Sequence, residues 1–216
     1  MDTSMMASMI GYSGNHRAQR PAERGFSLIE VMISMVVLTV GLISLLGVFG
    51  LAMASTQTSQ QDMIAKQLAN EAYESIVTAR NSSQLSWDQI QNNAGTQYCT
   101  SLPSPCGIFV GNASSPQLQP IYNAGADGIF GTSDDAAAGE ETLQDPGADG
   151  IFQTADDTFI PLTGYQRAIQ IGPVYDSANN LVTTVRSITI TVQYGTSQSG
   201  KTPKTYILNT LISQYQ

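Results

Sequence analysis

The sequence predicts an α+β fold: a long N-terminal helix, then a loop-rich insertion, then a C-terminal antiparallel β-sheet. Two observations carry this prediction. Residues 31–54 contain no charged side chain, and the stretch after them has apolar residues at three- and four-residue steps, as a helix with one covered face requires. From residue 165 onward, three segments alternate apolar with polar residues, which is typical of half-buried strands.

The apolar run is long enough to cross a membrane. Its 24 residues would form a helix of about 36 Å, against about 30 Å for the hydrocarbon core of a bilayer. The alternative is a buried core helix, but such helices seldom stay apolar on every face for so long. Arg17, Arg20 and Arg24 precede the run and no basic residue follows it closely. This asymmetry predicts a cytoplasmic N-terminus, with the rest of the chain outside.

Residues 26–80 are predicted to form one helix, with a membrane-spanning half at 26–54 and an amphipathic half at 55–80. In the second half, the positions expected to face a cover are Met63, Ile64, Leu68, Ala72, Ile76 and Val77. An amphipathic helix of this kind must bury its apolar side against another element.

The C-terminal part, residues 165–216, supplies that element. We expect three antiparallel strands separated by turns at 176–180 and 196–203. Their apolar faces comprise Tyr165, Arg167, Ile169 and Ile171, then Ile188, Ile190, Val192 and Tyr194, and finally Tyr206, Leu208, Thr210 and Ile212. The sheet and the amphipathic half of the helix each need a cover, so we expect them to cover one another.

The junction before the apolar run reads RGFSLIE at residues 24–30. It resembles the class III signal of type IV prepilins and pseudopilins. The resemblance implies cleavage by prepilin peptidase between Gly25 and Phe26, removal of residues 1–25 as a leader, and N-methylation of Phe26. It is tight over residues 24–54 and only architectural beyond about residue 80. The closing strand is most similar to the minor pilins termed PilV, or to the related minor pseudopilins.

Glu30 is the candidate assembly residue. A carboxylate deep in a bilayer costs on the order of 2–3 kcal/mol and is a functional candidate by default. The resemblance supplies its partner: in pilin fibres this glutamate faces the N-terminal amine of a neighbouring subunit, here the amine of Phe26. Pairing makes both charges tolerable in an apolar core and sets the axial register. The alternative is a Glu30 side chain that reaches the lipid headgroups.

The insertion, residues 81–164, has no lysine or arginine and contains both cysteines, Cys99 and Cys106. A segment outside the cytoplasm meets oxidising conditions, so we expect a disulfide between them rather than free thiols. Closing such a short loop is worth roughly 2–3 kcal/mol. A zinc site would need more ligands than the chain offers.

Residues 123–135 recur at 145–157 as an acidic, glycine-punctuated repeat. Carboxylates on flexible loops suit Ca²⁺. The expected ligands are Asp127, Asp134, Asp135, Asp149, Asp156 and Asp157, with Asn123 and Asp145 as the matching upstream pair. The alternative is a solvated acidic loop whose Ile-Phe pairs, 129–130 and 151–152, anchor it to the globular head, which we expect to run from about residue 81 to residue 216.

The composition excludes several functions. The 216 residues carry a formal net charge of −8, so no nucleic-acid partner is expected, since non-specific binding needs clustered Lys and Arg. The one histidine, His16, lies in the predicted leader, and no P-loop, dinucleotide fingerprint, nucleophile elbow or HExxH motif is present. We therefore expect no enzymatic activity.

Three roles fit these features. The first is a minor pilin that primes or modifies a type IV pilus. The second is a minor pseudopilin of a type II secretion system, and the third is a calcium-stabilised adhesive tip pilin. The expected partners are prepilin peptidase, other major and minor pilins, the inner-membrane assembly platform and membrane lipid. The expected location is the inner membrane, with a periplasmic head, and then the pilus at the cell surface.

Overall fold

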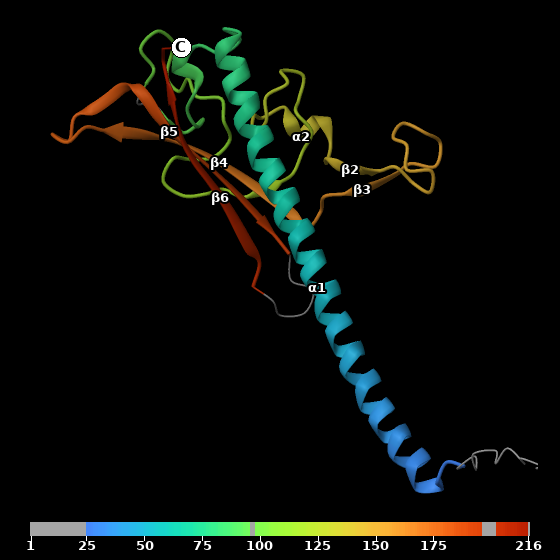
Figure 1. The fold of residues 1–216 in the computed structure, drawn as a ribbon. Helices are drawn as coiled ribbons and strands as arrows, with labels where there is room; N and C mark the ends of the chain where they lie inside the picture. Colours follow the sequence, from blue (N-terminus) through green and yellow to red (C-terminus); the bar gives the residue numbers. More distant parts are fainter. Residues whose placement is uncertain (1–24, 96–97, 196–201, 216) are drawn as a thin grey trace, which may run out of the picture. The chain divides into compact units, whose positions relative to one another are not determined.

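A computed structural model describes residues 25–95, 98–195 and 202–215 of the chain. The chain divides into two compact units, residues up to Leu51 and residues from Ala52 onward. Helix α1, Leu28–Asn81, is continuous through both units (Figure 1). Its bounds agree with the prediction within two residues at the start and one at the end. Residues 1–24 of the predicted leader, with His16 and its three arginines, lie outside the described residues.

A four-stranded antiparallel sheet follows in the order β1-β4-β5-β6. Its strands are β1 (Gln119–Pro120), β4 (Tyr165–Tyr175), β5 (Leu181–Tyr194) and β6 (Lys204–Ser213). The α+β architecture and the three C-terminal strands are therefore confirmed. The turn at 176–180 is also as predicted, because the carboxylate of Asp176 accepts hydrogen bonds from the N–H groups of Ala178 and Asn180. Most of the turn at 196–203 lies outside the described residues.

The insertion contains five short elements that the sequence did not predict. Besides β1, they are the 3₁₀ helix η1 (Trp87–Gln89), helix α2 (Asp135–Ala138), and strands β2 (Thr142–Asp145) and β3 (Thr158–Pro161), which pair as a separate hairpin. Asn92 joins the insertion to β4: its amide donates to the carbonyl of Ile169 at 2.8 Å and accepts from the N–H of Ile171 at 2.8 Å.

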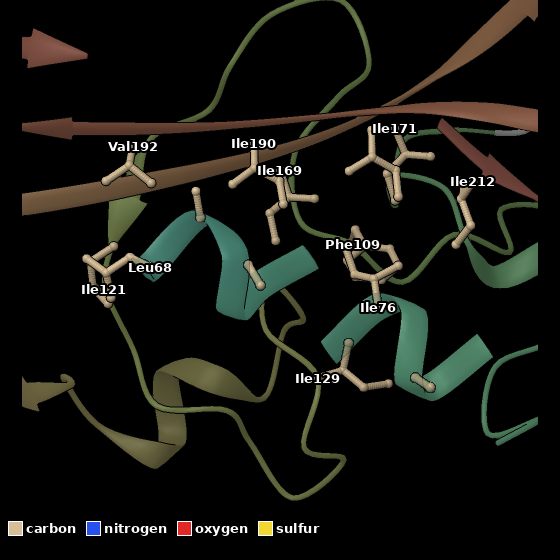
Figure 2. Packing of buried hydrophobic residues seen from close by; sticks show 14 of the residues in the cluster. Leu68, Ile76, Phe109, Ile121, Ile129, Ile169, Ile171, Ile190, Val192 and Ile212 are labelled. Carbon is tan, nitrogen blue, oxygen red and sulfur yellow. The ribbon is translucent and has the colours of Figure 1, made fainter. Parts of the chain in front are cut away.

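The core lies between the second half of α1, the sheet and the insertion. Most of the buried helix residues are alanines: the set is Ala65, Leu68, Ala69, Ala72, Ile76 and Ala79. Figure 2 shows Leu68 and Ile76 among insertion residues such as Phe109 and Ile129 and sheet residues such as Ile190. The sheet face predicted from the alternation is the face in this core. The prediction was wrong for Met63, whose side chain is 64% exposed. Ile64 and Val77 are partly buried and pack against the core.

The disulfide is present between Cys99 and Cys106, with Cα atoms 5.7 Å apart. The disulfide closes a short loop, and the carboxylate of Asp88 holds this loop by accepting hydrogen bonds from the N–H groups of Thr100 and Ser101. Burial opposes the ionisation of Asp88, but these hydrogen bonds outweigh it and lower the pKa of its carboxyl.

Two arginines of the sheet, Arg167 in β4 and Arg186 in β5, are buried, and the alternation predicted the first of them to face the core. Arg186 is fully buried, with its guanidinium 4.3 Å from the ring centre of Trp87 and 4.0 Å from that of Tyr98. It donates to the carbonyl of Ile90. Burial lowers its pKa to about 10. The two aromatic faces replace the water that the cation loses.

Glu141 lies at a groove of about 450 Å³ between α1 and β2, which Glu71 also lines. One of its carboxylate oxygens is buried with no hydrogen-bond partner among the described residues. Burial raises the pKa of Glu141 to about 7, repulsion from Glu71 adds to the rise, and Arg167 opposes it. The folded chain therefore holds a proton on Glu141 that the unfolded chain releases at lower pH.

We expect Glu141→Gln to stabilise the head above pH 7 and to have little effect near pH 4.5. Between these values the folded state binds more protons than the unfolded state, so stability falls as the pH rises. Thermal unfolding of the full chain in detergent, followed by circular dichroism at both pH values, measures this. Glu140→Gln, which changes an exposed neighbour, is the control. A lower melting temperature of Glu141→Gln at pH 8 would contradict the assignment.

Candidate functional site

The first turn of α1 is built around Ser27. The Ser27 carbonyl accepts hydrogen bonds from the N–H groups of Glu30 at 3.0 Å and Val31 at 3.2 Å. Glu30 therefore sits in the first helical turn, where the helix dipole favours a negative charge. Gly25 and Phe26 precede the helix and are exposed, which leaves the predicted cleavage bond accessible on the described chain.

The apolar half of α1 is exposed on all sides. No residue in its most hydrophobic stretch is buried by the rest of the described chain. By length and composition this helix could cross a membrane. A continuous apolar surface of this size in water is disfavoured, so it requires lipid or other protein chains as its surroundings.

The polar side chains within this half are satisfied inside the helix. The hydroxyls of Ser34, Thr39 and Ser44 donate to the carbonyls of Glu30, Met35 and Val40 at 2.7 to 2.9 Å. A hydroxyl bonded in this way needs no water. Glu30 is then the one ionisable side chain between Gly25 and Gln61, and it stands out chemically in an otherwise apolar segment.

The first acidic loop, residues 123–135, brings together three of the predicted calcium ligands. Asp127, Asp134 and Asp135 each offer a carboxylate oxygen within 4.8 Å of the other two. The hydroxyl of Thr132 lies 2.5 Å from Asp134 and 3.2 Å from Asp135. The N–H of Gly131 donates to the Asp135 carboxylate at 2.6 Å.

The second acidic loop repeats this network at equivalent positions. Thr154 is the equivalent of Thr132, and the Thr154 hydroxyl lies 2.7 Å from the carboxylate of Asp156 and 3.1 Å from that of Asp157. The N–H of Gln153 donates to Asp157 at 2.6 Å, as Gly131 does to Asp135. Asp149 accepts from the N–H of Ile151 at 2.8 Å, and the matching bond from Ile129 to Asp127 is 2.9 Å.

Backbone conformation confirms that the loops are structural copies. Gly131 has φ +87° and its counterpart Gln153 has φ +68°, both in the left-handed region. A Cβ at Gly131 would lie 2.4 Å from Cδ1 of Ile169, so the first copy requires glycine there. The side chain of Gln153 is exposed, and this position tolerates a larger residue.

The two copies differ in electrostatics because only the first is packed into the head. Burial raises the pKa of Asp135, although hydrogen bonds from Gly131 and Gly125 and the charge of Arg167 oppose the rise. At the equivalent Asp157, burial also acts to raise the pKa, but hydrogen bonds from Gln144, the Gln153 N–H and Thr154 together outweigh it and lower the pKa. Hydrogen bonds from Thr132 and Thr154 lower the pKa of Asp134 and Asp156, respectively.

The six aspartates therefore fall into two loops. Among the described residues, only Asp127, Asp134 and Asp135 meet as a group within 4.8 Å. The upstream pair stays outside it: the amide of Asn123 points its nitrogen at the carbonyls of residues 138–140, and Asp145 accepts from the N–H of Gly147. The carboxylates are satisfied by hydroxyl and N–H donors. Thr132 and Thr154 were not among the predicted site residues, although their matching places in the repeat could have identified them.

The Ile-Phe pairs of the two copies also lie in different surroundings. Ile129 is 1% exposed and belongs to the core, with Phe130 packed against it. Ile151 and Phe152 are 61% and 58% exposed. Ile129 and Phe130 therefore anchor the first loop to the head, as the alternative expected of both pairs, whereas Ile151 and Phe152 do not anchor the second loop.

Comparison with known proteins identifies the N-terminal segment. Residues 20–46 match the family model described as the prokaryotic N-terminal methylation motif. Searches of curated proteins and of solved structures found no match. The matched residues include Gly25, Phe26, Glu30 and the first part of the exposed apolar helix. This chain therefore carries a class III prepilin signal on a membrane-compatible helix, which supports a type IV pilin-like protein that prepilin peptidase processes and that assembles with other pilins.

Proposed function

We propose that this chain is a minor pilin of a type IV pilus, a structural subunit rather than an enzyme. The first half of α1 holds it in the inner membrane before assembly and lies in the fibre afterwards. The observation that carries the proposal is an apolar helix exposed on all sides with one carboxylate in its first turn. The methylation motif supports it, because it covers this same segment.

Glu30 would recognise the neighbouring subunit. Cleavage after Gly25 creates a new amine at Phe26, and a cation is what a carboxylate in an apolar fibre core requires. An amine and Glu30 of the same chain are close in sequence, but pairing between chains is the arrangement that fixes the axial stagger. The apolar surface on either side provides the attraction, and the ion pair selects the register.

The same construction suits a minor pseudopilin of a type II secretion system. The two roles differ in what a cell loses without the chain. We expect a deletion strain to lose piliation and twitching while it keeps exoprotein secretion. The opposite pattern would assign the chain to the secretion system.

Replacement of Glu30 should separate assembly from processing. We expect Glu30→Ala and Glu30→Gln to be cleaved and inserted normally, but to enter fibres at least about tenfold less, because one buried charge loses its partner. Immunoblots of sheared fibres against membranes measure incorporation. Glu74→Ala, which removes an exposed acid from the same helix, is the matched control and should incorporate normally. Normal incorporation of both Glu30 variants would refute the proposed role.

We further propose that Ca²⁺ stabilises the first acidic loop. The close approach of Asp127, Asp134 and Asp135 favours an oxygen-ligated cation. Extracellular sites of this kind typically bind at about 10⁻⁴–10⁻³ M. Such a site fills outside the cell, where the head of a pilin would lie, and empties in the cytoplasm. An adhesive tip pilin stabilised in this way would use the same loop.

Five millimolar Ca²⁺ should stabilise the head of the full chain in detergent by about 1–2 kcal/mol relative to EDTA, as a ligand of this affinity bound only by the folded state must. Differential scanning calorimetry measures the shift. Asp127→Asn and Asp134→Asn should abolish the response to Ca²⁺. Asp176→Asn, at a turn outside the loop, should keep it. An unchanged transition of the native chain would remove calcium from the account.

A further inference from the structure

The two acidic loops place the same short segment in two surroundings. Each has an Ile-Phe pair held by an aspartate at the start of the turn, Asp127 in the first and Asp149 in the second. In the first loop the pair is inserted into the head, and in the second it is exposed to solvent. The buried copy therefore shows which surface such a segment fits.

The surface that receives the first pair combines a helix and a basic side chain. Ile129 is buried in the same cluster as Ala72 and Ile76 of α1. The N–H of Phe130 donates to the hydroxyl of Ser75 on α1 at 3.3 Å. The guanidinium of Arg167 lies 4.6 Å from the centre of the Phe130 ring. The receptor is thus a helix face of small residues with a hydroxyl and a nearby cation.

The second pair lies at the far end of the β2–β3 hairpin (Figure 1). No partner for the N–H of Phe152 occurs among the described residues, in contrast to Phe130. The hairpin exposes further apolar side chains, with Phe159 at 62% and Ile160 at 48%. Two exposed large apolar residues at a loop tip, with others behind them, are typical of a contact surface.

We propose that Ile151 and Phe152 dock onto a helix face of a different subunit in the same fibre, a face with small side chains and a neighbouring Lys or Arg. This inference rests on the proposed function. A second copy of this chain is a poor receptor, because its own Ile129 and Phe130 already fill its matching surface. Four aspartates and no basic residue lie in the loop at 145–157, so its charge favours a basic partner and opposes an anionic lipid surface.

Site-specific photocrosslinking in piliated cells tests the contact directly. A benzophenone amino acid replaces Phe152 in the full chain, and a control carries it at Asn179, in the exposed β4–β5 turn. We expect position 152 alone to crosslink to another chain that carries a prepilin signal, with the crosslinked peptide on a helix of that chain. Crosslinks only to lipid, only to a second copy of this chain, or to nothing would overturn the inference.

Incorporation into fibres provides the second readout. Ile151→Ser with Phe152→Ser should leave the melting temperature unchanged, because both side chains are exposed, and should lower incorporation at least about tenfold. Ile207→Ser, an exposed apolar residue of β6, is the matched control and should incorporate normally. If the tip variant enters fibres normally while Glu30→Ala does not, the docking inference fails and the proposed function stands. If Glu30→Ala also enters normally, the proposed function itself fails.

Discussion

The exposed apolar half of α1 is the constraint on which the other features depend. Its hydroxyls are bonded to the helix backbone, and Glu30 is its one ionisable side chain. Such a surface is stable only in lipid or against other apolar helices. A fibre subunit lies in both surroundings in turn: it is embedded in the membrane before assembly, and the helices of neighbouring subunits replace the lipid around it afterwards. In the proposed function, the carboxylate of Glu30 would set the axial register, which apolar contact alone does not fix.

Beyond Leu51 the same helix meets a different requirement. Its buried face consists mostly of alanines, which let the sheet and the insertion approach α1 closely. Two polar side chains in this core have defined partners: Asn92 hydrogen-bonds to the backbone of β4, and the guanidinium of Arg186 lies against the rings of Trp87 and Tyr98. One continuous helix therefore has an exposed apolar first half, to which we assign assembly, and a second half that packs in the core of the head.

Much of the fold could be predicted because local patterns carry it. The period-two alternation identified the inward face of each long strand, and the apolar run identified the helix. Met63 was wrongly predicted to face the core because the prediction gave weight to large apolar side chains. The buried face of the helix consists mainly of alanines. The sequence could not show which copy of the acidic repeat packs into the head, because nearly identical residues adopt the same loop conformation in both copies. Tertiary packing alone buries Ile129 and exposes Ile151.

The most direct measurement is the N-terminal sequence and mass of the chain from the membranes of cells with active prepilin peptidase. Our account predicts a mature chain that begins with a methylated Phe26 and is recovered with the membrane and the fibres. A chain that keeps residues 1–25 in these cells and is recovered in the soluble fraction would contradict it.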